Sequence, residues 1–317
     1  IDFINSNNHF ANSLTQSVSY SSDMEILLDN YDTTALITPG MPGVAITFNG
    51  WAIDEWYNIR GLLNYYGARV TFFVGNINDL NSSDFEKLRT LKNAGHEVAT
   101  SGFRYVNAID FVRNYSLQTY IDTEITPAID LMSENDLFPT SYAYPFGSRN
   151  STIDSELLKY FLRLRSTAYT SNTTRIVDLD QVYYKWENEA LIRGVGIDSE
   201  YGNTIEEIIE GLERAQQSNE VLVLYGHTPT YDTPDYGTPV EKLISILEAA
   251  QMLNLELYRV SDLAVDLSST TTSPINNETN TNGIIGINDI LISIVLASAG
   301  VGILWVLASL IFPNKQK

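Results

Sequence analysis

The sequence predicts an α/β domain built on a parallel sheet, followed by one C-terminal transmembrane helix. Short β-branched and aromatic runs alternate with amphipathic helical stretches between residues 42 and 266. These runs are nearly continuous in apolar character, which is typical of strands covered on both faces. The run Ile290–Phe312 has no charged residue at all. The domain is therefore expected to hold a doubly wound sheet or a closed barrel, with the anchor helix after it.

The expected elements follow one another in a regular strand–helix order. The strands share β-branched, aromatic or small residues: Val44–Phe48, Val70–Val74, Glu97–Thr100, Ser141–Tyr144, Val221–Tyr225 and Leu255–Val260. The helices share apolar residues at helical spacing: Trp56–Tyr66, Ser83–Asn93, Leu117–Leu131, Ser151–Tyr160, Ile205–Gln216 and Val240–Ala250. Ser83 and Glu86 have the spacing of a capping box. Functional residues are expected at the C-terminal ends of the strands.

The ends of the chain differ from the domain in composition. Residues 1–41 are expected to form a polar arm, and 267–283 a polar stalk with almost nothing to bury. The anchor is expected within 284–313, because an apolar helix of about 23 residues spans roughly 35 Å. Residues 314–317 carry two Lys and predict a cytoplasmic tail, which places the domain outside the plasma membrane. The start at Ile1 is read as the mark of a removed export signal.

Charge and residue usage exclude several functions. The net charge is −20, from 39 acidic and 19 basic residues, so no basic surface is available for nucleic acid. Cys is absent, which excludes thiol nucleophiles and Cys-type zinc sites. Small residues four apart within the anchor (Ser293 with Ala297, Ser298 with Gly302) allow other membrane subunits to approach. Five sequons permit glycosylation, at Asn81, Asn114, Asn150, Asn172 and Asn277.

Several segments resemble polysaccharide deacetylases of the NodB-homology type. They are ITFNGW at 46–51, RVTFFV at 69–74, NAGHEVATSGFRY at 93–105, YAYPFG at 142–147, LRS at 164–166 and VLVLYGH at 221–227. The resemblance covers residues 42–266 and implies a distorted (β/α) barrel with one divalent metal, usually zinc. In the family, a carboxylate and two imidazoles hold the metal, and a second carboxylate is the base.

The residues that carry this chemistry are missing at the matching positions. The first motif places Asn49 at the base position and Gly50 at that of the metal-binding Asp. Counting from Gly95-His96-Glu97, the two His positions hold Ser101 and Tyr105. Asn does not take up a proton at neutral pH, and Gly and Ser do not replace the zinc ligands. No metal is therefore expected, and His227 is the only retained catalytic position.

Aromatic residues gather near the same expected face. Trp51, Tyr144, Phe146 and Tyr225 are candidates for stacking on a sugar or a protein partner, or for packing that fills the former site. Asp54, Glu55 and Glu97 are near the right loops but lack metal-ligand spacing. A Ser101–His227 nucleophile–base pair is the remaining catalytic option.

The leading interpretation is a membrane-anchored, deacetylase-like pseudoenzyme outside the cell. It binds glycan or protein at the surface, or serves as an accessory subunit of a membrane complex. Two alternatives remain open. One is an active hydrolase of C–N bonds in N-acetylated glycans, and the other is a structural component of the cell envelope.

Overall fold

The computed structural model describes residues 40–232 and 236–264. The expected arm, stalk, anchor and tail (1–41, 267–283, 284–313 and 314–317), together with Asn277, lie outside these residues apart from the arm's last two positions. No helix in the described part is long and apolar enough to cross a membrane.

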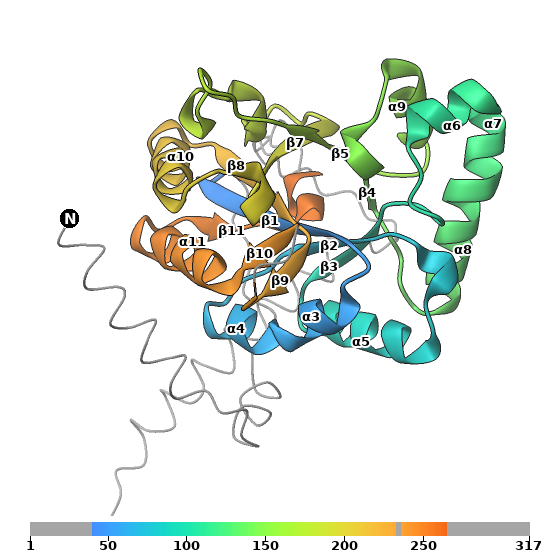
Figure 1. Cartoon of the computed structure of the whole chain (residues 1–317), viewed down its shortest axis with the longest axis horizontal. Coiled ribbons are helices and arrows are strands. Elements are labelled where there is room, and N and C mark those ends of the chain that lie inside the picture. Colours follow the sequence, from blue (N-terminus) through green and yellow to red (C-terminus); the bar gives the residue numbers. More distant parts are fainter. Residues whose placement is uncertain (1–39, 233–235, 265–317) are drawn as a thin grey trace, which may run out of the picture. The chain divides into compact units, whose positions relative to one another are not determined.

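Seven parallel strands close into a barrel (Figure 1). In barrel order they are β1 (Gly43–Gly50), β2 (Thr71–Val74), β3 (Glu97–Thr100), β4 (Ser141–Ala143), β5 (Arg163–Ala168), β7 (Leu191–Gly196) and β8 (Val221–Gly226). Pairing of β1 with β8 along six positions completes the ring. The ring is weakest between β3 and β4, which pair only at Thr100 and Tyr142. The expected fold is thus confirmed as a barrel.

Four short strands lie outside the ring. They are β6 (Tyr183–Tyr184), β9 (Thr228–Thr230), β10 (Gly237–Pro239) and β11 (Glu256–Leu257). β11 pairs with the first two residues of β1, and β6 runs antiparallel to β8. β9 and β10 pair with each other in the chain that follows β8.

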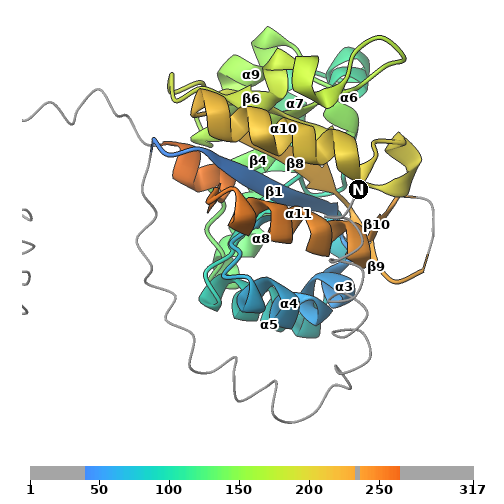
Figure 2. The same cartoon turned by 90° about the vertical axis from the view of Figure 1, so that its left-hand side faces the viewer.

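Helices surround the ring. The α-helices are α3 (Ile53–Asn58), α4 (Arg60–Tyr65), α5 (Ser82–Asn93), α6 (Ala108–Asn114), α7 (Leu117–Tyr120), α8 (Thr126–Glu134), α9 (Ser151–Leu157), α10 (Ile205–Ser218) and α11 (Val240–Met252). Single 3₁₀ turns cover Ile77–Asp79, Pro145–Gly147, Ile176–Asp178, Asp180–Val182, Ser199–Tyr201 and Val260–Ala264. β1 passes between α10 and α11 (Figure 2).

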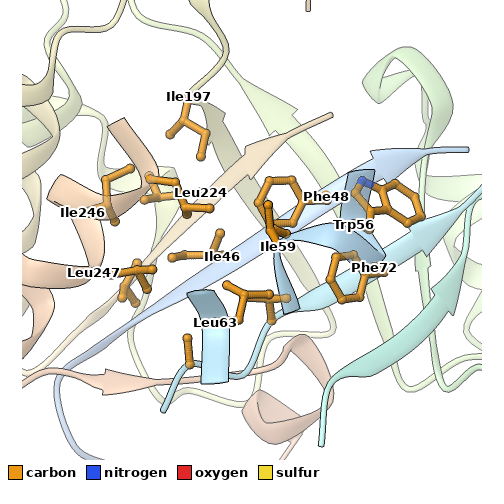
Figure 3. Close-up of a cluster of buried hydrophobic side chains, with 14 of the residues drawn as sticks. Ile46, Phe48, Trp56, Ile59, Leu63, Phe72, Ile197, Leu224, Ile246 and Leu247 are labelled. Carbon is orange, nitrogen blue, oxygen red and sulfur yellow. The ribbon is translucent and has the colours of Figure 1, made fainter. Parts of the chain in front are cut away.

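Strand periodicity separates an outer core from the barrel interior. Side chains alternate across a strand, so Ile46 and Phe48 face the helices while Ala45 faces inward. Figure 3 shows the outer cluster, in which Ile46 and Leu224 meet Ile246 and Leu247 of α11. The interior instead holds small residues such as Ala45, Ala99 and Ala143, beside Phe73 and Val223. Small inward residues leave room for larger polar side chains nearer the strand ends.

Some elements differ from expectation. The stretch predicted as one helix over 117–131 is divided by a π turn at Ile121–Ile125, because Pro127 lacks an N–H for the carbonyl four residues back. α5 is capped by Asn81 with Asp84, not by Ser83 with Glu86. β5 and β7 were missed as strands, since each carries Arg residues that interrupt the apolar pattern.

Candidate functional site

A cavity with a volume of about 790 Å³ lies at the C-terminal ends of the barrel strands. Every sequence-predicted site residue except Ser101 lines it: Asn49, Gly50, Trp51, Tyr105, Tyr144, Phe146, Tyr225 and His227. This cavity is called the groove below. Segments as far apart in sequence as β1 and β8 meet there because parallel strands direct their C-terminal ends to the same edge.

The retained His227 is held by a carboxylate that sequence reasoning missed. Its Nδ1 lies 2.6 Å from Oδ2 of Asp198, and its backbone N–H donates to Oδ1 at 3.1 Å. Asp198 also accepts from the Thr238 hydroxyl and is fully buried. Trp56 Nε1 donates to the carbonyl of His227 at 2.8 Å. The Nδ1 contact orients the imidazole, and the other two contacts hold the His227 backbone at the edge of the groove.

Close packing behind His227 requires glycine. A Cβ on Gly226 would lie 2.9 Å from Asp198 Oδ1 and would also meet the Thr238 hydroxyl. Gly226 therefore allows the strand end to approach the carboxylate. The signal for Asp198 in the sequence is its place directly after an apolar strand, which the arginine of LIRGVG obscured.

The positions expected to hold metal carry residues that do not fit one. Gly50 has no side chain, and its φ of +114° belongs to the region that favours glycine. Burial raises the pKa of the Tyr105 phenol, which keeps it protonated. Ser101 is buried, and its hydroxyl has no hydrogen-bond partner among the described residues. Nor do the described residues hold any group of three or more His, Cys, Asp or Glu able to bind a metal.

The other acidic candidates are paired with other groups or lie apart from one another. Asp54 is exposed and pairs with Lys87. Glu97 lies at the N-terminal end of β3, away from the C-terminal strand ends that form the groove. It accepts hydrogen bonds from the Thr71 hydroxyl at 2.8 Å and from the Ser261 N–H at 2.9 Å. Among the described residues that line the groove, Glu55 is the single acidic one. The proposed Ser101–His227 pair is not formed, because Ser101 makes no such bond and Nδ1 of His227 is taken by Asp198.

One chain of ring contacts follows the groove from β1 to the turn after β4. Trp51 meets Tyr105 edge-on, with centroids 5.4 Å apart, and Tyr105 meets Phe146 at 5.7 Å. Trp51 is 56% exposed and Phe146 67%. Gly75 makes room for this chain, since a Cβ there would meet the Tyr105 ring. Large apolar faces are thus left open to the groove.

A second chain joins Tyr225 to three tyrosines that the sequence analysis did not single out. Tyr201 contacts Tyr225 at 5.2 Å, and both Tyr169 and Tyr236 at 6.3 Å. Tyr236 also meets the His227 ring at 5.7 Å. Burial raises the pKa of Tyr201 to about 12, so its hydroxyl remains a neutral hydrogen-bonding group.

Two of the expected aromatic binding residues are more buried than expected. Tyr144 is only 1% exposed, and its hydroxyl donates to Asp154 Oδ1 at 2.7 Å, in the cluster below α9. Tyr225 is 2% exposed. Both form part of the groove wall, and their burial favours the packing alternative over stacking on a ligand.

The four described sequons are exposed at the protein surface. Asn114 and Asn172 lie in or beside loops. Asn81 and Asn150 use their side-chain oxygen as helix caps, accepting from Ser83 N and Ile153 N. The amide nitrogen that carries a glycan stays available in this arrangement.

Comparison with known proteins finds one family model that matches part of the chain. Residues 37–164 match the family model for polysaccharide deacetylase. No curated protein matches the sequence. Among solved structures, a CE4 family pseudoenzyme from Bacillus anthracis matches with a TM-score of 0.50 at 12% identity, over 72% of this chain and 67% of that one.

Other structural matches carry CE4 domains. A Streptococcus mutans CE4 esterase has a TM-score of 0.49 at 13% identity, covering 76% of this chain and 91% of its own. The CE4 domain of a xylanase from the hindgut metagenome of Trinervitermes trinervoides has a TM-score of 0.47 at 15% identity, covering 74% and 93%.

Proposed function

From the match of residues 37–164 to the polysaccharide deacetylase family model, we propose that the chain is a deacetylase-like pseudoenzyme that binds glycans in its groove. The observation that carries the proposal is the combination of lost and kept residues in one cavity. Uncharged residues occupy the base and metal positions, while open aromatic faces surround them.

The lost positions argue against the family's hydrolysis. Asn49 is 3% exposed, and its amide cannot accept the proton of an attacking water at neutral pH. Gly50, Ser101 and Tyr105 together provide no charged ligand for zinc. Losing both the base and the metal removes the two groups that prepare the nucleophile.

The kept features support sugar binding. Trp51 and Phe146 present open rings, and aromatic rings with nearby polar groups suit the apolar face and hydroxyls of a sugar. The His227 imidazole and the Tyr201 and Tyr236 phenols line the same cavity and supply hydrogen-bonding groups. The cavity volume lies within the range of ordinary ligand sites.

The location of this activity is proposed from the sequence. The apolar run Ile290–Phe312 and the Lys-bearing tail support a domain held outside the plasma membrane by one helix. A glycan-binding domain in that place would contact cell-surface polysaccharide, alone or beside other membrane subunits.

The test is glycan-array binding by the full chain with Trp51→Ala and Phe146→Ala combined. We expect a loss of at least roughly tenfold in affinity, because stacking faces of this kind contribute about 0.5–1.5 kcal/mol each beyond area burial. The matched control combines Tyr65→Ala and Tyr115→Ala, which removes equally exposed rings outside the groove. Glycan binding that survives the groove variant, or no glycan binding by the unmodified chain, would refute the proposal and favour a protein-binding or structural role.

The His227–Asp198 pair favours one second candidate, a hydrolase that uses His227 as an acid or base without the family's metal. Its test is turnover of N-acetylglucosamine oligomers together with the metal content of the purified chain. Turnover that His227→Ala abolishes, in a chain without stoichiometric zinc, would establish this candidate in place of the pseudoenzyme. Stoichiometric zinc would contradict both this candidate and the pseudoenzyme.

A further inference from the structure

Arg165 places a buried positive charge at the groove without a carboxylate partner. It comes from the inward face of β5, is 1% exposed, and lines the groove. It forms no ion pair with any described residue. The other Arg on the inward face of this strand, Arg163, instead donates to the Leu263 carbonyl and to Asn188.

The surroundings of Arg165 compensate its charge only in part. The guanidinium lies 5.3 Å from the Phe73 ring centroid and 5.1 Å from that of Tyr225. Ring quadrupoles attract a cation but do not replace the hydrogen bonds lost with water. Burial accordingly lowers the pKa of Arg165 from its usual value. A buried cation of this kind is costly to keep unless something pairs with it.

The unpaired atoms have a defined geometry. Nε and Nη2 of Arg165 have no hydrogen-bond partner among the described residues. These two N–H groups lie on one edge of the planar guanidinium and form the fork that binds two oxygens of a carboxylate side by side. Asn49, which lines the same groove, also has an unpartnered side-chain oxygen.

We propose that the groove selects a sugar that carries a carboxylate, such as a hexuronic acid, and that Arg165 binds this carboxylate. This inference rests on the proposed glycan-binding function and names its ligand class. The open rings of Trp51 and Phe146 hold the sugar ring, and the acidic group reaches the guanidinium below. Because the fork is covered from solvent, a side-chain rotation of Arg165 accompanies binding.

Charge balance favours a carboxylate over a doubly charged phosphate. One monoanion neutralises the single cation of Arg165. Asp198 is buried behind His227, and Glu55 lines the groove, so a second negative charge on the ligand would be repelled by both. The net charge of −20 also disfavours densely charged ligands at long range.

The experiment compares matched ligands on the full chain purified in detergent. The probes are trigalacturonate, its carboxyl-reduced counterpart, and a trisaccharide of the same linkage carrying 6-O-phosphate. We expect the unmodified chain to bind the uronate roughly tenfold or more tightly than the reduced sugar, as charged hydrogen bonds would allow. Equal binding of the phosphorylated sugar would overturn the assignment of a carboxylate.

The variant Arg165→Gln tests the residue itself. It should reduce the preference for uronate to near one while leaving the affinity for the reduced sugar within about threefold. Arg193→Gln, on the neighbouring strand, should leave the preference unchanged. Circular dichroism checks that each variant is folded, and the ligand comparison on the unmodified chain stands even if Arg165→Gln does not fold.

The outcomes separate the two proposals. Equal binding of uronate and reduced sugar by the unmodified chain, or a preference that survives Arg165→Gln, overturns the inference and leaves glycan binding intact. A chain that binds neither sugar, on the array or in solution, overturns glycan binding as well.

Discussion

At the scale of single residues, the former metal position is changed in its backbone as well as in its side chain. Gly50 has a φ of +114°, where a residue with a Cβ is strained, although nothing lies within 4 Å of the position that a Cβ would take. Returning an Asp to this position therefore requires the end of β1 to change conformation. The backbone therefore disfavours the metal-binding Asp that the family resemblance would place here.

Gly50→Ala should lower the free energy of unfolding by about 1–3 kcal/mol through backbone strain alone. Gly61→Ala is the control, because Gly61 lies in helix α4, where Ala is favoured by up to about 1 kcal/mol. Urea denaturation measures both variants. An unchanged stability of Gly50→Ala would show that the left-handed conformation is not strained.

His96 is a structural histidine below the barrel. Its Nδ1 accepts from the Val70 N–H at 3.3 Å, and its ring meets Phe72 edge-on. Burial, with help from Arg259 and Arg69, lowers its pKa to about 3. The unfolded chain returns this pKa to about 6.5.

Stability should fall as the pH decreases from about 6.5 toward 3. In that window the unfolded chain binds a proton at His96 that the folded chain does not, which favours unfolding by up to about 1.4 kcal/mol per pH unit. His96→Gln should remove this part of the pH dependence, as measured by denaturation at pH 7 and pH 5. Equal slopes for the variant and the unmodified chain would contradict the assignment.

At the scale of elements, local sequence signals identified helices more reliably than their ends. Helix α5 begins at Ser82, one residue before the predicted start at Ser83, and two capping motifs are present near this end. Asn81 accepts from the Ser83 and Asp84 N–H groups, and Asp84 accepts from the Asn81 N–H at 3.0 Å. The reciprocal pair starts two residues before the Ser83–Glu86 motif that the sequence suggested.

Asn81→Ala should destabilise the domain by about 1 kcal/mol, the usual effect of losing an N-cap. Ser83→Ala, which removes the capping residue suggested by the sequence, should change stability by less than about 0.5 kcal/mol. Thermal unfolding of both variants decides between the two caps. A larger effect at Ser83 would reverse the assignment.

At the scale of the whole molecule, barrel closure gathers the candidate site. Asn49, Arg165 and His227 come from β1, β5 and the end of β8, and they line one groove only because β1 pairs with β8. The weak β3–β4 pairing lies beside the turn that carries Tyr105. The anchor predicted beyond residue 283 remains a prediction at this scale.

The full chain should stay in the membrane pellet after alkaline carbonate washing, because the 290–312 run is apolar over the length of a bilayer core. Deleting residues 284–313 should move the protein to the supernatant. Deleting the polar segment 267–283 is the control and should leave it in the pellet. Release of the unmodified chain by carbonate would rule out a spanning helix.

The sequence by itself predicted alternating strands and helices, and its family resemblance predicted the barrel, the changed catalytic positions and the retained His227. Strand periodicity and short motifs are local properties, which a linear pattern contains. The tertiary structure alone decided that Asp198 holds His227, that the Tyr144 hydroxyl bonds to Asp154, and that Arg165 is buried without a carboxylate partner among the described residues. These contacts join residues that are far apart in the sequence. Their partners and burial depend on barrel closure, which a local sequence pattern does not contain.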